Sequence, residues 1–237
     1  MSYILSIETS TAICSVAIHN EGKLMANADL YLEKSHSNSL TPLIEQLLHH
    51  CDLQMKDLSA IAVSSGPGSY TGLRIGLSTA KGLCYALDIP LISISSLDSM
   101  TIQILNFHKE DNSIYIPMLD ARRMEVFYKV SDRDMVEVEK MSNLILDEDS
   151  FSNYISNYKS VFLFGNGAEK GFDLLKNQSD KFILIDKVNP SAQFYGEMAF
   201  KKFKKEHFED LAYFEPNYGK EFYSPKSKKK SFLDLNR

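Results

Sequence analysis

Residues 64–76, with the sequence SSGPGSYTGLRIG, constrain the fold of this chain more than any other segment. The segment begins at the end of an apolar run that predicts a buried strand. It then makes a tight Gly-Pro turn and enters a helix predicted over Thr71–Leu87. That helix contains Gly72, Gly76 and Gly82, and each glycine inside a helix costs about 1 kcal/mol relative to alanine. Such a cost requires a compensating contact.

The spacing of the small residues indicates where that contact lies. Gly72, Gly76 and Ala80 recur every four residues and therefore share one face of the helix. We expect another backbone to lie close against this face, and we expect the face to be a docking surface for a partner.

The composition is that of an ordinary globular protein, with 237 residues, 44% hydrophobic and 24% charged. This length suits one large domain or two lobes. No apolar run reaches a membrane-spanning length, and the first residues enter a strand pattern directly, so we expect a cytoplasmic protein. Cys14, Cys51 and Cys84 lie far apart among apolar neighbours, which favours buried thiols over a redox or metal role.

The net charge of −5 argues against a protein that binds nucleic acid on its own, because such proteins carry a basic footprint. The basic residues gather on a late helix and in the tail, as Lys201, Lys202, Lys204, Lys205, Lys226, Lys228, Lys229 and Lys230. A solvated helix face and a frayed terminus are the favoured interpretation. The alternative is an accessory contact to RNA phosphates.

The order of predicted elements indicates two related lobes. Residues 1–108 predict three strands, then helix, strand, helix, strand and helix. The polar stretch 109–113 is the predicted boundary, and residues 109–237 partly restart this order. The second half predicts strands at 114–119, 125–130, 135–139 and 161–164, helices at 151–158 and after 167, and a last helix capped by Ser191. We expect two mixed α/β sheets, with the last helix packing back on the first lobe and a basic tail beyond it.

The glycine turn does not match the common nucleotide or nucleophile motifs. A dinucleotide fingerprint requires a third glycine where this chain has Thr71, and no Gly-Lys-Ser/Thr of a Walker loop follows. A hydrolase elbow requires its serine one position away from Ser69. No two histidines lie at i, i+4, so a helical metal pair is not predicted either.

Two polar turns are candidates for anion contacts. The hydroxyls of Thr9-Ser10-Thr11 follow a strand, and such a hairpin turn can bind phosphate through its backbone N–H groups. The alternative is a plain polar turn. Arg122 and Arg123 follow Asp120 in a second turn, where a surface ion network is favoured and an interface or anion contact is the alternative.

Together these segments resemble the TsaB (YeaZ) family, which acts in the biosynthesis of threonylcarbamoyladenosine in tRNA. The similarity runs from residue 4 to about residue 200 and is carried by residues 4–11, 15–18, 36–42, 65–76, 90–97, 120–126 and 165–168. The Gly-Pro block is typical of the TsaB/TsaD superfamily. The Asp-Ala-Arg-Arg segment is typical of TsaB itself.

The resemblance implies a two-lobed, actin-like α/β fold of the sugar-kinase and heat-shock (ribonuclease-H-like) class. It implies pairing with TsaD, or with a second copy, through the first two helices. The ATPase TsaE joins the pair, ATP or ADP binds near the junction, and tRNA is contacted indirectly. On this chain the implied interface residues are Leu40, Leu43, Leu47, Gly72, Leu73, Gly76, Thr79 and Ala80. The chain itself is expected to need no cofactor, and Glu8 stands where many relatives carry Asp.

The resemblance also implies that the chain is not an enzyme. The TsaD pattern has two metal-binding histidines where this chain has Ser96 and Met100, and a hydroxyl and a thioether replace imidazoles poorly. We therefore expect no catalytic residues, no metal and a scaffold role. The alternatives are a free-standing actin-like ATPase or sugar kinase, an M22-type metallopeptidase, and a homodimer that has no TsaD partner.

Overall fold

A five-stranded mixed sheet forms the core of the amino-terminal lobe in the computed structural model, which describes residues 1–31 and 36–219. Its strands are β1 (Tyr3–Glu8), β2 (Cys14–Asn20), β3 (Lys23–Leu30), β4 (Leu58–Ser64) and β5 (Leu91–Ile94), in the order β3-β2-β1-β4-β5. β1 pairs antiparallel with β2 and parallel with β4. β4 also pairs parallel with β5, so the carboxyl ends of β1, β4 and β5 meet at one edge of the sheet.

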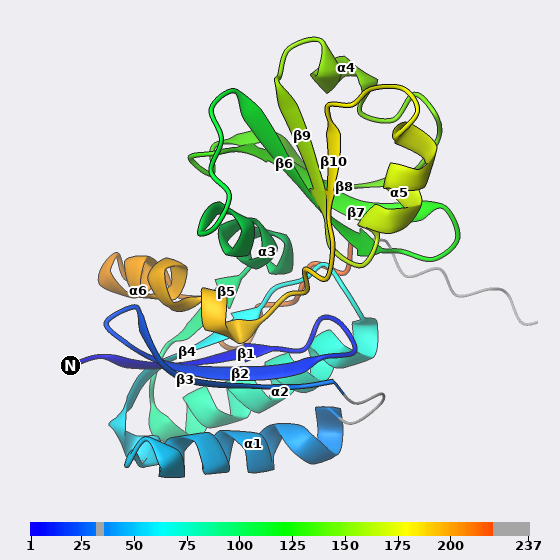
Figure 1. The fold of residues 1–237 in the computed structure, drawn as a ribbon. Coiled ribbons are helices and arrows are strands. Elements are labelled where there is room, and N and C mark those ends of the chain that lie inside the picture. Colours follow the sequence, from blue (N-terminus) through cyan, green and yellow to red (C-terminus); the bar gives the residue numbers. More distant parts are fainter. Residues whose placement is uncertain (32–35, 220–237) are drawn as a thin grey trace, which may run out of the picture.

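Helices cover both faces of this sheet (Figure 1). They are α1 (His36–His50) and α2 (Tyr70–Leu87) on one face and α6 (Gly196–Lys204) on the other. Within β1, Leu5 and Ile7 pack toward α1 and α2, whereas Ile4 packs toward α6. Because both faces are covered, the strand is apolar at nearly every position rather than at every second one.

The carboxy-terminal lobe repeats this arrangement. Its strands are β6 (Ser113–Asp120), β7 (Glu125–Asp132), β8 (Glu137–Ile145), β9 (Ser160–Phe164) and β10 (Phe182–Ile185), in the order β10-β9-β6-β7-β8. One face packs on α4 (Ser152–Ile155) and α5 (Ala168–Leu175). The other face packs on α3 (Ser96–Leu105), which lies between the lobes in Figure 1.

Both lobes follow the order β-β-β-α-β-α-β, so the predicted two-lobed α/β fold is confirmed. The chain passes from one sheet to the other between α3 and β6. It returns through residues 186–195, after which α6 packs on β1 and β5 of the first sheet.

Two predicted elements differ from the structure, and one strand of the structure was not predicted. The strand predicted at 135–139 is β8, which begins at Glu137 and continues to Ile145, because Met135 adopts a left-handed φ of 63° in the preceding turn. The helix predicted at 151–158 is reduced to the four residues of α4, because Phe151 is itself left-handed, with a φ of 61°. β10, a run of only four residues, was not predicted.

The last helix also begins later than predicted. Ser191 caps a 3₁₀ turn at Ala192–Phe194, and α6 starts at Gly196. A side chain at Gly196 would overlap the carbonyl oxygen of Gly22, so the glycine lets the start of α6 approach the β2–β3 turn.

The lysines of α6 were predicted to form a solvated face, and only some of them do. Lys201 is exposed beside Glu197, whereas the ammonium group of Lys202 donates to the carbonyl oxygen of Ser93 at 2.7 Å. The lysines predicted to form a basic tail, Lys226, Lys228, Lys229 and Lys230, lie outside the described residues. No helix in the described part of the chain is long and apolar enough to span a membrane.

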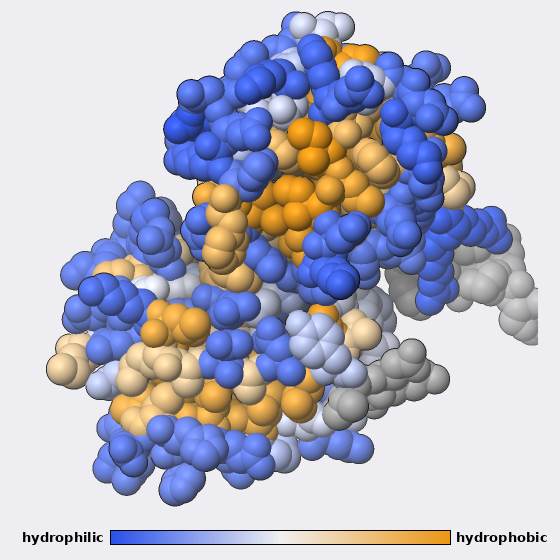
Figure 2. All heavy atoms as spheres, viewed as in Figure 1, coloured by the Kyte–Doolittle hydropathy of each residue, from blue (hydrophilic) through white to orange (hydrophobic). Residues whose placement is uncertain are grey.

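Figure 2 shows an apolar area on the carboxy-terminal lobe, in front of the sheet and framed by hydrophilic residues. Ile183 of the edge strand β10 is 36% exposed, and its neighbours Leu184 and Ile185 are partly exposed. α5 packs beside β10, where Leu184 joins the core under α4 and α5 and Ile185 joins the core under α3, so Ile183 is the most exposed residue of this edge strand.

Candidate partner-binding surface and inter-lobe site

The glycine-proline turn is a helix cap fastened to the first hairpin. Gly66 and Gly68 have left-handed φ values of 88° and 156°, which favour glycine. Ser69 is the N-cap of α2, and its hydroxyl accepts a hydrogen bond from the N–H of Gly72 at 3.2 Å. The N–H of Ser69 donates to the carbonyl oxygen of Ser10 at 2.6 Å. The start of α2 is thus held by the turn between β1 and β2.

The predicted close backbone is present, and it belongs to the same chain. A side chain at Gly72 would overlap the carbonyl oxygen of Thr9, and one at Gly76 would overlap the Thr9 hydroxyl. That hydroxyl donates to the carbonyl oxygen of Gly72 at 2.9 Å. The expectation that a partner occupies the glycine face is therefore wrong, because the β1–β2 turn already fills it.

Most other predicted interface residues also face the core of their own lobe. Leu40, Leu43, Leu47, Leu73 and Ala80 are all less than 9% exposed, and of the eight only Thr79 is partly exposed. Their regular spacing reflects the stripe that each amphipathic helix presents to its sheet. A partner interface on α1 and α2 stays a prediction, and the room for it lies on their outer faces.

The outer face of α2 carries Arg74, Ser78, Gly82 and Tyr85, all of them exposed. A side chain built at Gly82 would meet no atom within 4 Å among the described residues. The tyrosine ring is 84% exposed. Gly82 follows Gly76 by six residues, about 120° away around the helix, and this offset could have distinguished the two glycines from sequence alone.

The turn predicted to contact phosphate is largely enclosed. Thr9 is buried with its hydroxyl engaged, and Ser10 is 2% exposed. The carbonyl oxygen of Thr11 contacts Nε2 of His36 at 2.7 Å, and the side chain of Thr11 is partly exposed. The Thr9 hydroxyl is therefore not free to bind a phosphate in this conformation. For Ser10 and Thr11 the contact stays a prediction.

A buried acid lies beside this turn. The carboxylate of Glu8 accepts a hydrogen bond from the N–H of Ser10 at 2.5 Å and another from the hydroxyl of Tyr195 at 2.6 Å. Burial first, and then the charge of Glu8, raise the pKa of Tyr195 well above its ordinary value. Sequence reasoning missed this pair because no local pattern relates residues 187 positions apart.

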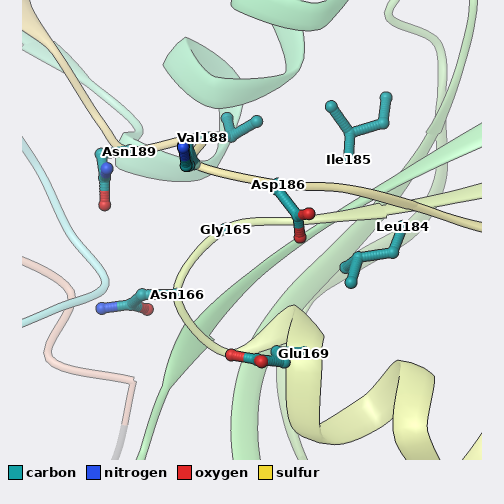
Figure 3. A pocket seen from close by; sticks show the side chains of 9 residues that line it. Gly165, Asn166, Glu169, Leu184, Ile185, Asp186, Val188 and Asn189 are labelled. Atoms are coloured by element: carbon teal, nitrogen blue, oxygen red, sulfur yellow. The ribbon is translucent and has the colours of Figure 1, made fainter.

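A pocket of about 210 Å³ opens at the carboxyl ends of β9 and β10 (Figure 3). Its polar lining includes Asn166 and Glu169 from the start of α5 and Asp186, Lys187 and Asn189 from the returning chain. The pocket is smaller than most sites for small molecules, and side chains of both charges line it. The lining therefore indicates no single class of ligand.

The positions compared with the metal site of TsaD are buried. Ser96 and Met100 on α3 are both 0% exposed, and the thioether packs with the core between α3 and the second sheet. Within residues 1–31 and 36–219, no three His, Cys, Asp or Glu side chains gather as metal ligands would.

The predicted ion network at the second polar turn is formed by a lysine. Lys170 donates to the carboxylate of Asp120 and to the carbonyl oxygens of Arg123, at 2.8 Å, and Glu125, at 2.7 Å. Arg122 and Arg123 are both left-handed and exposed. The arginines therefore project from a turn whose backbone the lysine holds.

Comparison with known proteins gives consistent matches. A family model described as "TsaD: tRNA N6-adenosine threonylcarbamoyltransferase" matches residues 31–218. The tRNA threonylcarbamoyladenosine biosynthesis protein TsaB of Bacillus subtilis is 40% identical over 124 residues, which are 52% of each chain. TsaB of Escherichia coli is 34% identical over 131 residues, 55% of each chain. The matched part of the chain thus spans about half the length of these curated relatives.

Solved structures agree on the fold. A solved structure described as "YeaZ from Pseudomonas aeruginosa" superposes with a TM-score of 0.73 at 23% identity, covering 91% of this chain and 99% of that one. A second structure, of a protein from the same organism described as similar to peptidase YeaZ, has a TM-score of 0.75 at 22% identity and covers 93% of this chain and all of its own. The sequence matches and the shared fold lead to one assignment: the chain belongs to the family that the TsaD model describes, within its TsaB (YeaZ) branch.

Proposed function

We propose that this chain is a non-catalytic scaffold subunit in the formation of threonylcarbamoyladenosine in tRNA. It pairs with TsaD through the outer faces of α1 and α2, the pair assembles with TsaE, and tRNA is contacted indirectly. In the absence of TsaD the same surface pairs two copies of the chain. The relatives named for this pathway support the proposal.

The observation that carries the proposal is the exposed glycine at position 82. The cost of placing Gly72 and Gly76 in a helix is offset by their close contact with Thr9, but Gly82 has open space around it. A glycine in the middle of a helix costs about 1 kcal/mol relative to alanine, and nothing in the described residues offsets this cost. A partner helix resting on Gly82 would offset it, since the missing side chain permits a close approach. The neighbouring Tyr85, 84% exposed, is of the residue type that is enriched at interface anchors.

The scaffold role is supported by side chains at the candidate metal and phosphate positions that are engaged within the chain itself. At the position compared with the TsaD metal site, Met100 packs in the core. The Thr9 hydroxyl and both oxygens of Glu8 are engaged within the chain. We therefore propose that ATP or ADP, if present, binds where a partner contributes to the site. ATP turnover by the purified chain alone would instead favour the ATPase or kinase alternative.

The test replaces Gly82 by leucine, which fills the open space on α2. We expect Gly82→Leu to weaken pairing with TsaD by at least about tenfold in Kd, measured by isothermal titration calorimetry, because the new side chain holds the partner away. Reconstituted threonylcarbamoylation should fall in parallel. The thermal midpoint of the isolated chain should not fall, because leucine is a better helix former than glycine and meets no neighbour.

The matched control is Ala86→Leu, one turn further along the exposed side of the helix and near its end. We expect a smaller effect there, because no glycine marks that position for close approach. Normal pairing by Gly82→Leu would contradict the proposed surface, and normal modification of tRNA without this chain would contradict the scaffold role.

A further inference from the structure

The chain that returns from the second lobe is attached to the first sheet by buried and partly buried polar contacts. The hydroxyl of Ser191 donates to the carboxylate of Asp29 at 3.1 Å, and the N–H of Ala192 donates to the hydroxyl of Ser15 at 2.8 Å. Nε2 of His19 contacts the carbonyl oxygen of Gln193 at 3.1 Å. This segment ends at Tyr195, whose side chain is 0% exposed.

From Tyr195 a continuous path of short contacts leads to the first turn of α2. The tyrosine hydroxyl donates to Oε2 of Glu8 at 2.6 Å, and Oε1 of the same carboxylate accepts the N–H of Ser10 at 2.5 Å. The carbonyl oxygen of Ser10 then accepts the N–H of Ser69, the N-cap of α2, at 2.6 Å. Each link joins a different element.

The end of this path leaves α2 little freedom to shift. Side chains at Gly72 or Gly76 would overlap Thr9, and one at Gly68 would overlap the backbone of Ser10. The β1–β2 turn is therefore in full contact with the helix and its cap. A displacement of the turn would displace α2, because a closely packed interior has few voids into which the turn could move.

We propose that Tyr195 is a positioning residue for partner binding: through Glu8 and the β1–β2 turn, it sets where the outer face of α2 lies relative to the second lobe. The inference rests on the proposed function, since it concerns the same face of α2. The tyrosine contacts no partner itself, because it is enclosed beneath α6.

The buried carboxylate of Glu8 depends on its hydrogen bond from Tyr195. A buried carboxylate needs hydrogen-bond donors, and the Glu8 carboxylate has two, one from the backbone and one from Tyr195. Burial and Glu8 raise the pKa of the tyrosine, so its hydroxyl keeps its proton and donates throughout the neutral range. Removing that donor leaves one carboxylate oxygen buried without its partner, and the turn must rearrange to hydrate it.

The test compares two tyrosines that have the same chemistry. Tyr195→Phe removes the hydroxyl that faces Glu8. Tyr154→Phe removes a hydroxyl that donates to Glu139 at 2.6 Å in the second lobe, where the ring is 7% exposed. We expect Tyr195→Phe to raise the Kd for TsaD by about five- to tenfold and Tyr154→Phe by less than about twofold. Thermal midpoints of both variants are measured alongside, since Glu139 is partly exposed and keeps a second donor in Tyr128. Amide hydrogen exchange of residues 66–76 should accelerate only in Tyr195→Phe.

A second variant separates positioning from general destabilisation. Glu8→Gln combined with Tyr195→Phe removes the buried charge together with its donor, so partner affinity should recover in part toward that of the unchanged chain. Equal affinity losses for Tyr195→Phe and Tyr154→Phe would overturn the inference, as would unchanged exchange in residues 66–76. If Gly82→Leu pairs normally, the proposed pairing surface fails, and if tRNA is modified normally without this chain, the proposed scaffold role fails. If Gly82→Leu weakens pairing and Tyr195→Phe does not, the pairing surface is supported and the positioning role of Tyr195 is contradicted.

Discussion

The hydroxyl of Thr9 donates a hydrogen bond to the carbonyl oxygen of Gly72 over 2.9 Å, and so joins the end of β1 to the first turn of α2. Gly72 and Gly76 both face Thr9 of the same chain, so the absence of their side chains is explained by packing within the lobe. This packing also separates them from the third glycine, which lies on the open side of the helix.

Gly76→Ala should lower the free energy of unfolding by about 1–3 kcal/mol, because the new Cβ would overlap the Thr9 hydroxyl. Gly82→Ala is the matched change on the open face and should raise that free energy by up to about 1 kcal/mol. Urea denaturation of both variants measures the contrast. Equal effects of the two changes would show that the glycine face is not packed as described.

Lys170→Met should lower the free energy of unfolding by about 1–3 kcal/mol, because it removes the donor shared by Asp120 and two carbonyl oxygens of the β6–β7 turn. Lys176→Met removes an exposed pair with Asp173 and should change stability by less than about 0.5 kcal/mol. Both are measured by denaturation at neutral pH. A larger effect at Lys176 would contradict the role assigned to Lys170.

The stability of the chain should depend on His19 below neutral pH. Burial lowers the pKa of this imidazole, against a smaller opposing effect of its contact with Gln193. Well above pH 6.5 the side chain is neutral both folded and unfolded, so it adds no pH dependence. Below pH 6.5 the unfolded chain binds the proton first, so stability falls as the pH drops toward the folded pKa, by at most about 1.4 kcal/mol for each pH unit.

The measurement is the difference in unfolding free energy between the unchanged chain and His19→Gln at pH 7.5, 6.5 and 5.5. The His19 difference should shrink as the pH falls. A His19 difference that grows toward low pH would reverse the assigned sign.

Thiol labelling should distinguish the three cysteines. Burial, followed by the charge of Asp29, raises the pKa of Cys14 to about 11, and burial raises that of Cys84 to about 12. Cys51 also has a raised pKa but is partly exposed. At pH 8 a disulfide reagent should therefore modify Cys51 first, because the reagent can reach it, and the other two only on unfolding. Rapid reaction of all three in the folded chain would contradict the packing of β2 and α2.

Much of the architecture was predictable because it depends on periodic, local information. The strands of the first lobe and the amphipathic stripe of α1 follow from apolar spacing. The need for a close backbone beside Gly72 and Gly76 follows from the cost of helical glycine. β10 was not predicted and α4 was predicted too long, because four-residue elements carry too little pattern and their bounds depend on neighbouring strands.

The sequence by itself determined the family, the two lobes and the requirement for a contact along the glycines of α2. Tertiary structure alone decided which molecule supplies that contact: it is Thr9 of the same chain, 63 residues away from Gly72, and this leaves Gly82 on the open side. Tertiary structure also brought Tyr195 to Glu8. The physical reason is the same in both cases. Helical and strand periods describe neighbours within a few positions, whereas contacts between distant segments depend on how whole elements pack.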